Sequence, residues 1–245
     1  MIQNCLKQRF EHTSQLLRFC HFQLGFKSFS FSVLPMTVCP QLLQTDTIEK
    51  PAVCVIYPYC SRSKSLHDRA VINCQYSMAT FSTAERKRRP HGDRKSSEMS
   101  LHLKQTFEAA VLTELYPRSQ IDIYVKILQA DGGNYSACVN AATLALVDAG
   151  IPMRDYVCAC TAGFVEDTPL ADLCHAEESG GGTSLALALL PRSGNIALLQ
   201  MDARLHQDHL DALIEAAMTA CKGLSKVLDG VVRQHLEEVS VLTRD

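Results

Sequence analysis

The stretch that decides the fold is LQADGGNYSACVNAATLALVDAGIPM, residues 128–153. A glycine pair, Gly132 and Gly133, interrupts an apolar run, and small and apolar side chains then recur at helical spacing over residues 134–149. Gly150 follows where a left-handed cap ends a helix, and a proline stands shortly beyond it. The stretch therefore predicts the end of a strand, a glycine loop and a helix.

The flanking segments extend this order in both directions. Upstream, apolar and polar residues alternate over residues 121–127, which is typical of a half-buried strand. A helical pattern over residues 99–115 and a run of strand formers over residues 70–77 come before it. The downstream patterns predict strands, a hairpin and a final long helix, at residues 156–165, 184–190, 196–200 and 210–239. This alternation predicts an α+β fold of layered sheets and helices.

Composition limits the class of protein. The chain has 245 residues, of which 47% are hydrophobic and 20% charged, enough to bury a sizeable core. Its net charge of -2 gives no reason to expect nucleic-acid binding by the molecule as a whole, so such binding would depend on local cations. No run approaches the roughly 20 apolar residues of a membrane-spanning helix, so we expect no membrane contact.

The cysteines indicate a reducing compartment. There are 11 of them, an odd number without a CxxC spacing, so we expect free thiols. Cys158, Cys160, Cys174 and His175 could form a zinc site, but buried core thiols are the commoner outcome.

Three motifs together resemble one family. They are residues 128–153, the tetrapeptide CQYS at residues 74–77, and RKRRPHGDRK at residues 86–95. The chain from residue 61 to residue 245 resembles the RNase PH superfamily, and within it the exosome ring subunit whose archaeal counterpart is phosphorolytic. The resemblance implies an RNase PH-like fold of the ribosomal protein S5 domain 2 type, over a domain of residues 61–245.

The resemblance also allows the phosphate site to be checked. Active members let phosphate attack the 3′ end of RNA, and their glycine pair is followed by a small hydroxyl residue and an arginine that binds this phosphate. Here Gly132 and Gly133 are followed by Asn134 and Tyr135, so the cation is missing.

The metal site of the active pattern is also incomplete. That pattern places two aspartates six residues apart, where this chain has Glu178 and Ser184, with Asp172 upstream. We therefore expect a protein that is not an enzyme, with no metal or cofactor, and an acidic edge exposed to solvent. The alternative is an active phosphorolytic or metal-dependent 3′ to 5′ exoribonuclease that uses Glu178 and Asp172.

Cations persist in one loop. By resemblance, they line a path for single-stranded RNA, and the candidates are Arg62, Lys64, Arg86, Lys87, Arg88, Arg89, Arg94 and Lys95. The competing interpretations are a nuclear localisation patch at residues 87–89 or a solvated loop. Phe81 is the only aromatic residue close upstream, so base stacking is not expected.

The resemblance implies a non-catalytic ring subunit that guides RNA 3′ ends. Its partners would be paralogous RNase PH-like ring subunits, RNA-binding cap subunits and an associated 3′ to 5′ nuclease. The implied compartments are the nucleus, the nucleolus and the cytoplasm.

The first 60 residues do not follow the family pattern. Residues 1–60 show no sustained period and lack the opening segment of the family. The alternatives are a disordered segment, an alternative first exon or a gene-model error, with a mitochondrial presequence as a weaker alternative. If the N-terminal strands are missing, a sheet edge is left unpaired, and assembly into a ring is in doubt.

Overall fold

The structure is a computed structural model. It describes residues 30–37, 49–59, 66–83, 86, 92–165 and 168–242. The elements follow in the order β1 (Ser30–Thr37), β2 (Glu49–Tyr59), β3 (Val71–Met78), α2 (Arg94–Ala110), η2 (Thr113–Leu115), β4 (Gln120–Ile127), α3 (Asn134–Asp148), β5 (Cys158–Val165), β6 (Thr168–Ala171), α4 (His175–Ser179), β7 (Thr183–Leu190), β8 (Asn195–Met201) and α5 (Gln207–Leu242).

The strands form two sheets. The first has the order β1-β2-β4-β3, in which β3 and β4 run parallel and the other neighbours antiparallel. The second has the order β6-β5-β7-β8 and is antiparallel throughout. Because β3 and β4 are parallel, their carboxyl ends meet at one edge of the first sheet.

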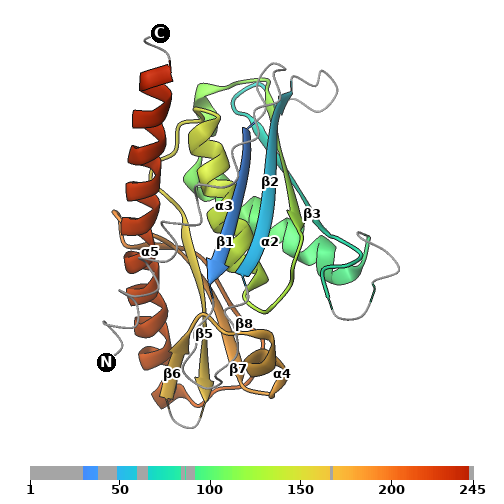
Figure 1. Cartoon of the computed structure of the whole chain (residues 1–245), viewed down its shortest axis with the longest axis vertical. Helices are drawn as coiled ribbons and strands as arrows, with labels where there is room; N and C mark the ends of the chain where they lie inside the picture. Colours follow the sequence, from blue (N-terminus) through green and yellow to red (C-terminus); the bar gives the residue numbers. More distant parts are fainter. Residues whose placement is uncertain are drawn as a thin grey trace.

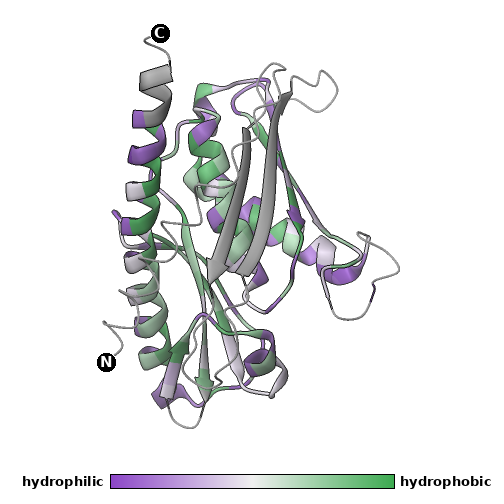
Figure 2. Cartoon of the chain, viewed as in Figure 1, coloured by the Kyte–Doolittle hydropathy of each residue, from purple (hydrophilic) through white to green (hydrophobic). Residues whose placement is uncertain are grey.

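The sheets and helices stack in layers. Helices α2 and α3 cover the first sheet, α3 also contacts β5, and α5 lies on the other face of the second sheet (Figure 1). Alternate residues at the start of β5 serve the two sides: Ala159, with Val157 directly before the strand, joins the core around α3, whereas Cys158 and Cys160 join the core under α5. Figure 2 shows α3 apolar along most of its length, while α5 has hydrophilic and hydrophobic faces, as expected for an inner and an outer helix.

Residues 1–60 correct one expectation. The sequence suggested that N-terminal strands could be missing, but β1 and β2 both lie in this segment. Residues 52–59 of β2 pair with β4 along its whole length, on the side away from β3. Strand β2 therefore pairs with the edge of β4 that was expected to be open, and it supplies hydrogen-bond partners for the backbone groups of β4 on that side. Whether residues 1–60 and 61–245 are separate units stays a prediction.

The remaining elements agree with the sequence apart from their bounds. The strand and helix expected around the glycine pair are β4 and α3, and the expected hairpin is β7 and β8. The helix predicted over residues 99–115 starts earlier and ends at Ala110, because Val111 turns into an isolated bridge with Met153. The short elements β6 and α4 were not predicted. No helix in the described ranges combines the length and apolarity that crossing a bilayer requires.

Three polar side chains of α3 fix it to β5. The hydroxyls of Ser136 and Thr161 lie 2.8 Å apart, and Thr143 Oγ1 donates to the carbonyl of Val157 at 2.8 Å. Asn140 forms two bonds with the backbone of Ala159, donating from Nδ2 at 3.0 Å and accepting at Oδ1 at 2.9 Å. Strand β6 pairs only with residues 162–165 of β5, so Asn140 satisfies backbone groups that β6 does not reach.

Candidate RNA-binding and phosphate site

The site lies where the parallel strands β3 and β4 end. Strand β4 leads into the glycine loop, residues 131–133, and β3 leads into a turn over residues 79–82. The two segments are bonded to each other, since Ala79 donates its N–H to Ile127 at 2.9 Å and Ala130 donates to Ser82 at 2.8 Å. Carboxyl ends of neighbouring parallel strands often hold ligands, so this edge is the natural place for the predicted site.

Gly132 is required by a close backbone approach. It has φ of +76°, and a Cβ there would lie 2.6 Å from the carbonyl oxygen of Leu173. Gly133 is the N-cap of α3 in the left-handed conformation, with φ of +53°. The glycine pair therefore lets the loop pack directly against the segment between β6 and α4.

Two carboxylates border the start of α3. Glu178 accepts a hydrogen bond at Oε1 from the backbone N–H of Gly133 at 2.8 Å. A Cβ on Gly133 would lie 3.6 Å from Oδ1 of Asp172, so this second carboxylate is also beside the loop. Asp172 has φ of +66°, an uncommon conformation that Asp tolerates better than most residues. Negatively charged side chains are commonly found at the start of a helix, where the backbone N–H groups carry partial positive charge.

Helix α4 is bonded to the glycine loop at one residue and stabilised by its own N-terminal cap. The backbone N–H of His175 donates to Oδ1 of Asp131 at 3.2 Å, and the N–H of Cys174 donates to Glu177 at 2.7 Å. The second of these bonds belongs to a capping box at the start of α4. Asp131 and Thr161 were not predicted as site residues from the sequence, although the position of Asp131 directly before the glycine pair was a usable signal.

Tyr135 does not line the site. Its side chain is 4% exposed and its hydroxyl lies 2.6 Å from Oγ1 of Thr106 on α2. Burial raises the pKa of Tyr135 above its usual range, against the weaker opposing effect of the Thr106 hydrogen bond. The side chain thus belongs to the core between α2 and α3 and does not face the glycine loop. Asn134 is partly exposed at the first position of α3.

Ser184 lies on β7, where it pairs with Gly163 of β5, whereas the backbone of Gly133 bonds Glu178. Of the predicted metal set, Asp172 and Glu178 thus come together at Gly133. In the described part of the chain, no three His, Cys, Asp or Glu side chains gather in a way that could hold a metal ion, and this includes the candidate zinc residues. These residues do not fit a three-ligand metal centre.

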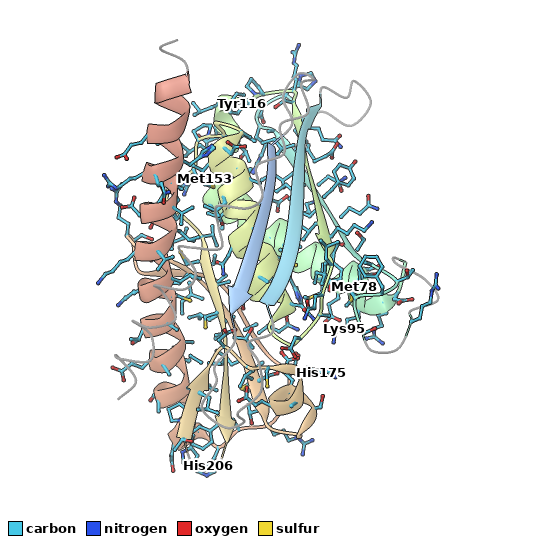
Figure 3. All side chains as sticks on the ribbon, in the orientation of Figure 1. Met78, Lys95, Tyr116, Met153, His175 and His206 are labelled. Atoms are coloured by element: carbon cyan, nitrogen blue, oxygen red, sulfur yellow. The ribbon has the colours of Figure 1, made fainter. Side chains whose placement is uncertain are left out.

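The predicted cations fall into two groups. Arg86, Arg94 and Lys95 are exposed, the latter two in the first turn of α2. Figure 3 shows Met78, Lys95 and His175 along one edge of the molecule, at the ends of β3 and α2 and at α4. The other five, Arg62, Lys64, Lys87, Arg88 and Arg89, lie outside the described residues.

Comparison with known proteins identifies the family. The model of the 3′ exoribonuclease family, domain 1, matches residues 52–152, and the model of domain 2 matches residues 155–220. The chain belongs to the 3′ exoribonuclease family. It is 71% identical over 185 residues to the exosome complex component RRP41 of Bos taurus, covering 76% of each chain. It is 47% identical over 173 residues to the Arabidopsis thaliana RRP41 homologue, covering 71% of each chain. It is 45% identical over 161 residues to Rrp41 of Methanopyrus kandleri, covering 66% of this chain and 67% of that protein.

Family membership contradicts the expectation that the chain is not an enzyme. Both matched models describe 3′ exoribonucleases, and an archaeal Rrp41 is among the relatives. The expectation depended on the cation missing after the glycine pair and on the incomplete pair of carboxylates, with Ser184 at the second position. A carboxylate, Glu178, is retained at the glycine loop.

Solved structures agree on the fold. Rice Rrp46 superposes with a TM-score of 0.66 at 18% identity, covering 88% of this chain and 98% of that one. The RNA-bound exosome of Archaeoglobus fulgidus gives a TM-score of 0.63 at 18% identity, covering 90% of this chain and 98% of that one. Both confirm an RNase PH-like fold of mixed helices and strands.

Proposed function

We propose that this chain is a ring subunit of an RNA exosome and contacts single-stranded RNA 3′ ends along the edge formed by the carboxyl ends of β3 and β4. The observation that carries the proposal is the bonding of the turn over residues 79–82 to the segment before the glycine loop. Ser82 accepts a bond from Ala130, directly before that loop, and the cations at residues 86, 94 and 95 follow this turn in the chain. Sequence similarity to exosome components over 76% of the chain supports the assembly.

The cations at this edge suit phosphate contacts. Arg94 and Lys95 are exposed at the start of α2, where the helix also contributes partial positive charge. Arg86, before α2 in the chain, adds a third exposed cation. Contacts with phosphates are independent of sequence and weaken as salt rises, because binding releases counterions. By the sequence prediction, Arg62, Lys64, Lys87, Arg88 and Arg89 also belong to this path, but they lie outside the described residues.

Charge reversal tests the RNA contact. The double variant Arg94→Glu with Lys95→Glu should weaken binding of a single-stranded RNA and flatten the dependence of log K on log salt by about 0.7 for each phosphate that is no longer neutralised. The matched control is Arg192→Glu with Lys222→Glu, two exposed cations on the β7–β8 turn and on α5. Equal affinities and salt slopes for the two double variants would refute the proposed path.

Co-expression tests the assembly. With the paralogous ring subunits, the cap subunits and the 3′ to 5′ nuclease expressed together, an affinity tag on this chain should recover the ring. A chain that elutes alone, at the mass of a monomer, would contradict the assembly. The proposed compartments, nucleus, nucleolus and cytoplasm, follow from the same similarity and can be checked by imaging a tagged chain.

A second candidate function is 3′ to 5′ exoribonuclease activity of the chain itself. The favouring observation is the pair of carboxylates, Asp172 and Glu178, at the start of α3 beside the glycine loop. Incubation of RNA with phosphate and magnesium should then release nucleoside diphosphates, and Glu178→Ala should abolish the release. Activity that is unchanged in Glu178→Ala would assign it to a contaminating nuclease.

A further inference from the structure

Phe81 lies at the tip of a turn that is fixed at both ends. The N–H of Ser82 donates to the carbonyl of Ala79 at 3.1 Å and closes the turn. The N–H of Ala79 donates to Ile127 at 2.9 Å, and the carbonyl of Ser82 accepts from Ala130 at 2.8 Å. The backbone that carries Phe81 is therefore anchored to the end of β4 on both sides.

The ring itself projects away from the molecule. Phe81 is 71% exposed, more than any other large apolar side chain that the structure describes, whereas Ala79 and Ser82 are 3% and 4% exposed. A single exposed apolar side chain is common on protein surfaces and needs no partner by itself. The backbone of this one is held in place, so a partner that packs on the ring loses little free energy in ordering it.

The neighbours of Phe81 indicate the kind of partner. On one side the turn is bonded to Ala130, next to the glycine loop. On the other side the chain continues to exposed Arg86 and to Arg94 and Lys95 at the start of α2. An exposed aromatic ring that is followed in the chain by exposed cations fits a polyanion that carries flat aromatic groups, which describes single-stranded nucleic acid.

We propose that Phe81 is a stacking platform for an unpaired base of RNA. This extends the proposed RNA contact, on which it rests, and replaces the expectation that base stacking plays no part. Stacking on an aromatic side chain tolerates every base, because each base has a π-face. The subsite therefore adds affinity for bases without adding sequence preference, while the nearby cations hold the phosphates.

The test compares two oligonucleotides with equal backbones. Full-length protein is titrated into a labelled oligoadenylate of about 12 nucleotides, within the usual site sizes, and into an abasic oligonucleotide of the same length. Fluorescence anisotropy gives the affinities of the wild type, Phe81→Ala and Phe81→Tyr. Leu115→Ala is the matched control, because Leu115 is 60% exposed and lies near the start of β3, at the opposite end from the turn.

We expect Phe81→Ala to weaken oligoadenylate binding by about 5- to 150-fold and to leave the abasic affinity unchanged. Phe81→Tyr and Leu115→Ala should bind both oligonucleotides like the wild type. Stacking is refuted if the wild type binds both oligonucleotides equally, or if Phe81→Ala changes neither affinity or both alike. It is also refuted if Phe81→Ala spares RNA binding but releases a protein partner. Failure of the wild type to bind either oligonucleotide would refute the RNA contact itself, and the stacking with it.

Discussion

Replacing Asn140 with alanine should destabilise the protein by disconnecting α3 from β5. Asn140 is 1% exposed and bonds both the N–H and the carbonyl of Ala159, which is fully buried. The alanine variant leaves these two backbone groups without partners, because β6 does not extend to Ala159. Each buried group that loses its hydrogen bond costs about 1–3 kcal/mol, so the free energy of unfolding should fall by about 2–6 kcal/mol.

Urea unfolding followed by circular dichroism measures this loss. The matched control is Gln105→Ala, which removes an exposed amide side chain from α2 and should change stability by about 0.5 kcal/mol or less. Thr143→Val supplies an intermediate case, because it removes the hydroxyl that donates to the carbonyl of Val157. Each kcal/mol should also lower the melting temperature by about 2–4 °C.

Unfolding of Asn140→Ala at the same urea concentration as Gln105→Ala would refute this role of Asn140. That result would mean that water or a shift of α3 satisfies Ala159. Normal stability of Asn140→Ala together with a loss for Thr143→Val would place the main connection at Val157 instead.

Three further predictions concern single side chains. Gly132→Ala should lower the melting temperature more than Gly150→Ala. Both glycines have positive φ, but only at Gly132 would a Cβ meet the backbone, 2.6 Å from the carbonyl oxygen of Leu173. Equal losses for the two variants would contradict the close approach. Burial raises the pKa of Cys158 to about 12, so iodoacetamide at pH 8 should modify this thiol only after the protein unfolds. Rapid modification of Cys158 in the native protein, found by peptide mass mapping, would be inconsistent with its burial. Burial raises the pKa of Tyr135 in the folded state, so its contribution to the free energy of unfolding is fully present below about pH 10, the pKa of an unfolded tyrosine, and is lost as pH rises further. Tyr135→Phe should therefore reduce the fall in stability at alkaline pH, and urea unfolding at several pH values measures this.

Periodicity was sufficient to predict the elements around the glycine pair. The strand and helix at residues 121–127 and 134–149 agree with β4 and α3, because one alternates strictly and the other has clear start and stop signals. Periodicity gave no signal for β6 and α4, which are too short to show one. The strands β1 and β2 were missed because residues 1–60 carry no regular alternation, and the pairing of β2 depends on a partner distant in sequence.

The sequence named residues that the structure brings together, but it did not indicate how their neighbours pack. The glycine pair and, by resemblance, Glu178 were candidate residues, and all three lie together, while their function stays a prediction. The sequence did not indicate where the side chain of Tyr135 points, and in the structure its hydroxyl lies beside Thr106. Sequence position gives a residue's place along a helix, but which neighbour it packs against depends on how α2 and α3 lie together, and that is a tertiary property.

The site depends on the docking of the two family domains. The glycine loop belongs to the first matched domain, residues 52–152, and Asp172 and Glu178 belong to the second, residues 155–220. Every bond described between α3 and β5 crosses the same boundary, as does the bond between Gly133 and Glu178. Neither domain alone could therefore hold the carboxylates at the start of α3. Substitutions that loosen the contact between α3 and β5 should thus weaken the glycine-loop site as well as the fold. The strongest case is Asn140→Ala, although none of the bonds described joins Asn140 to that loop.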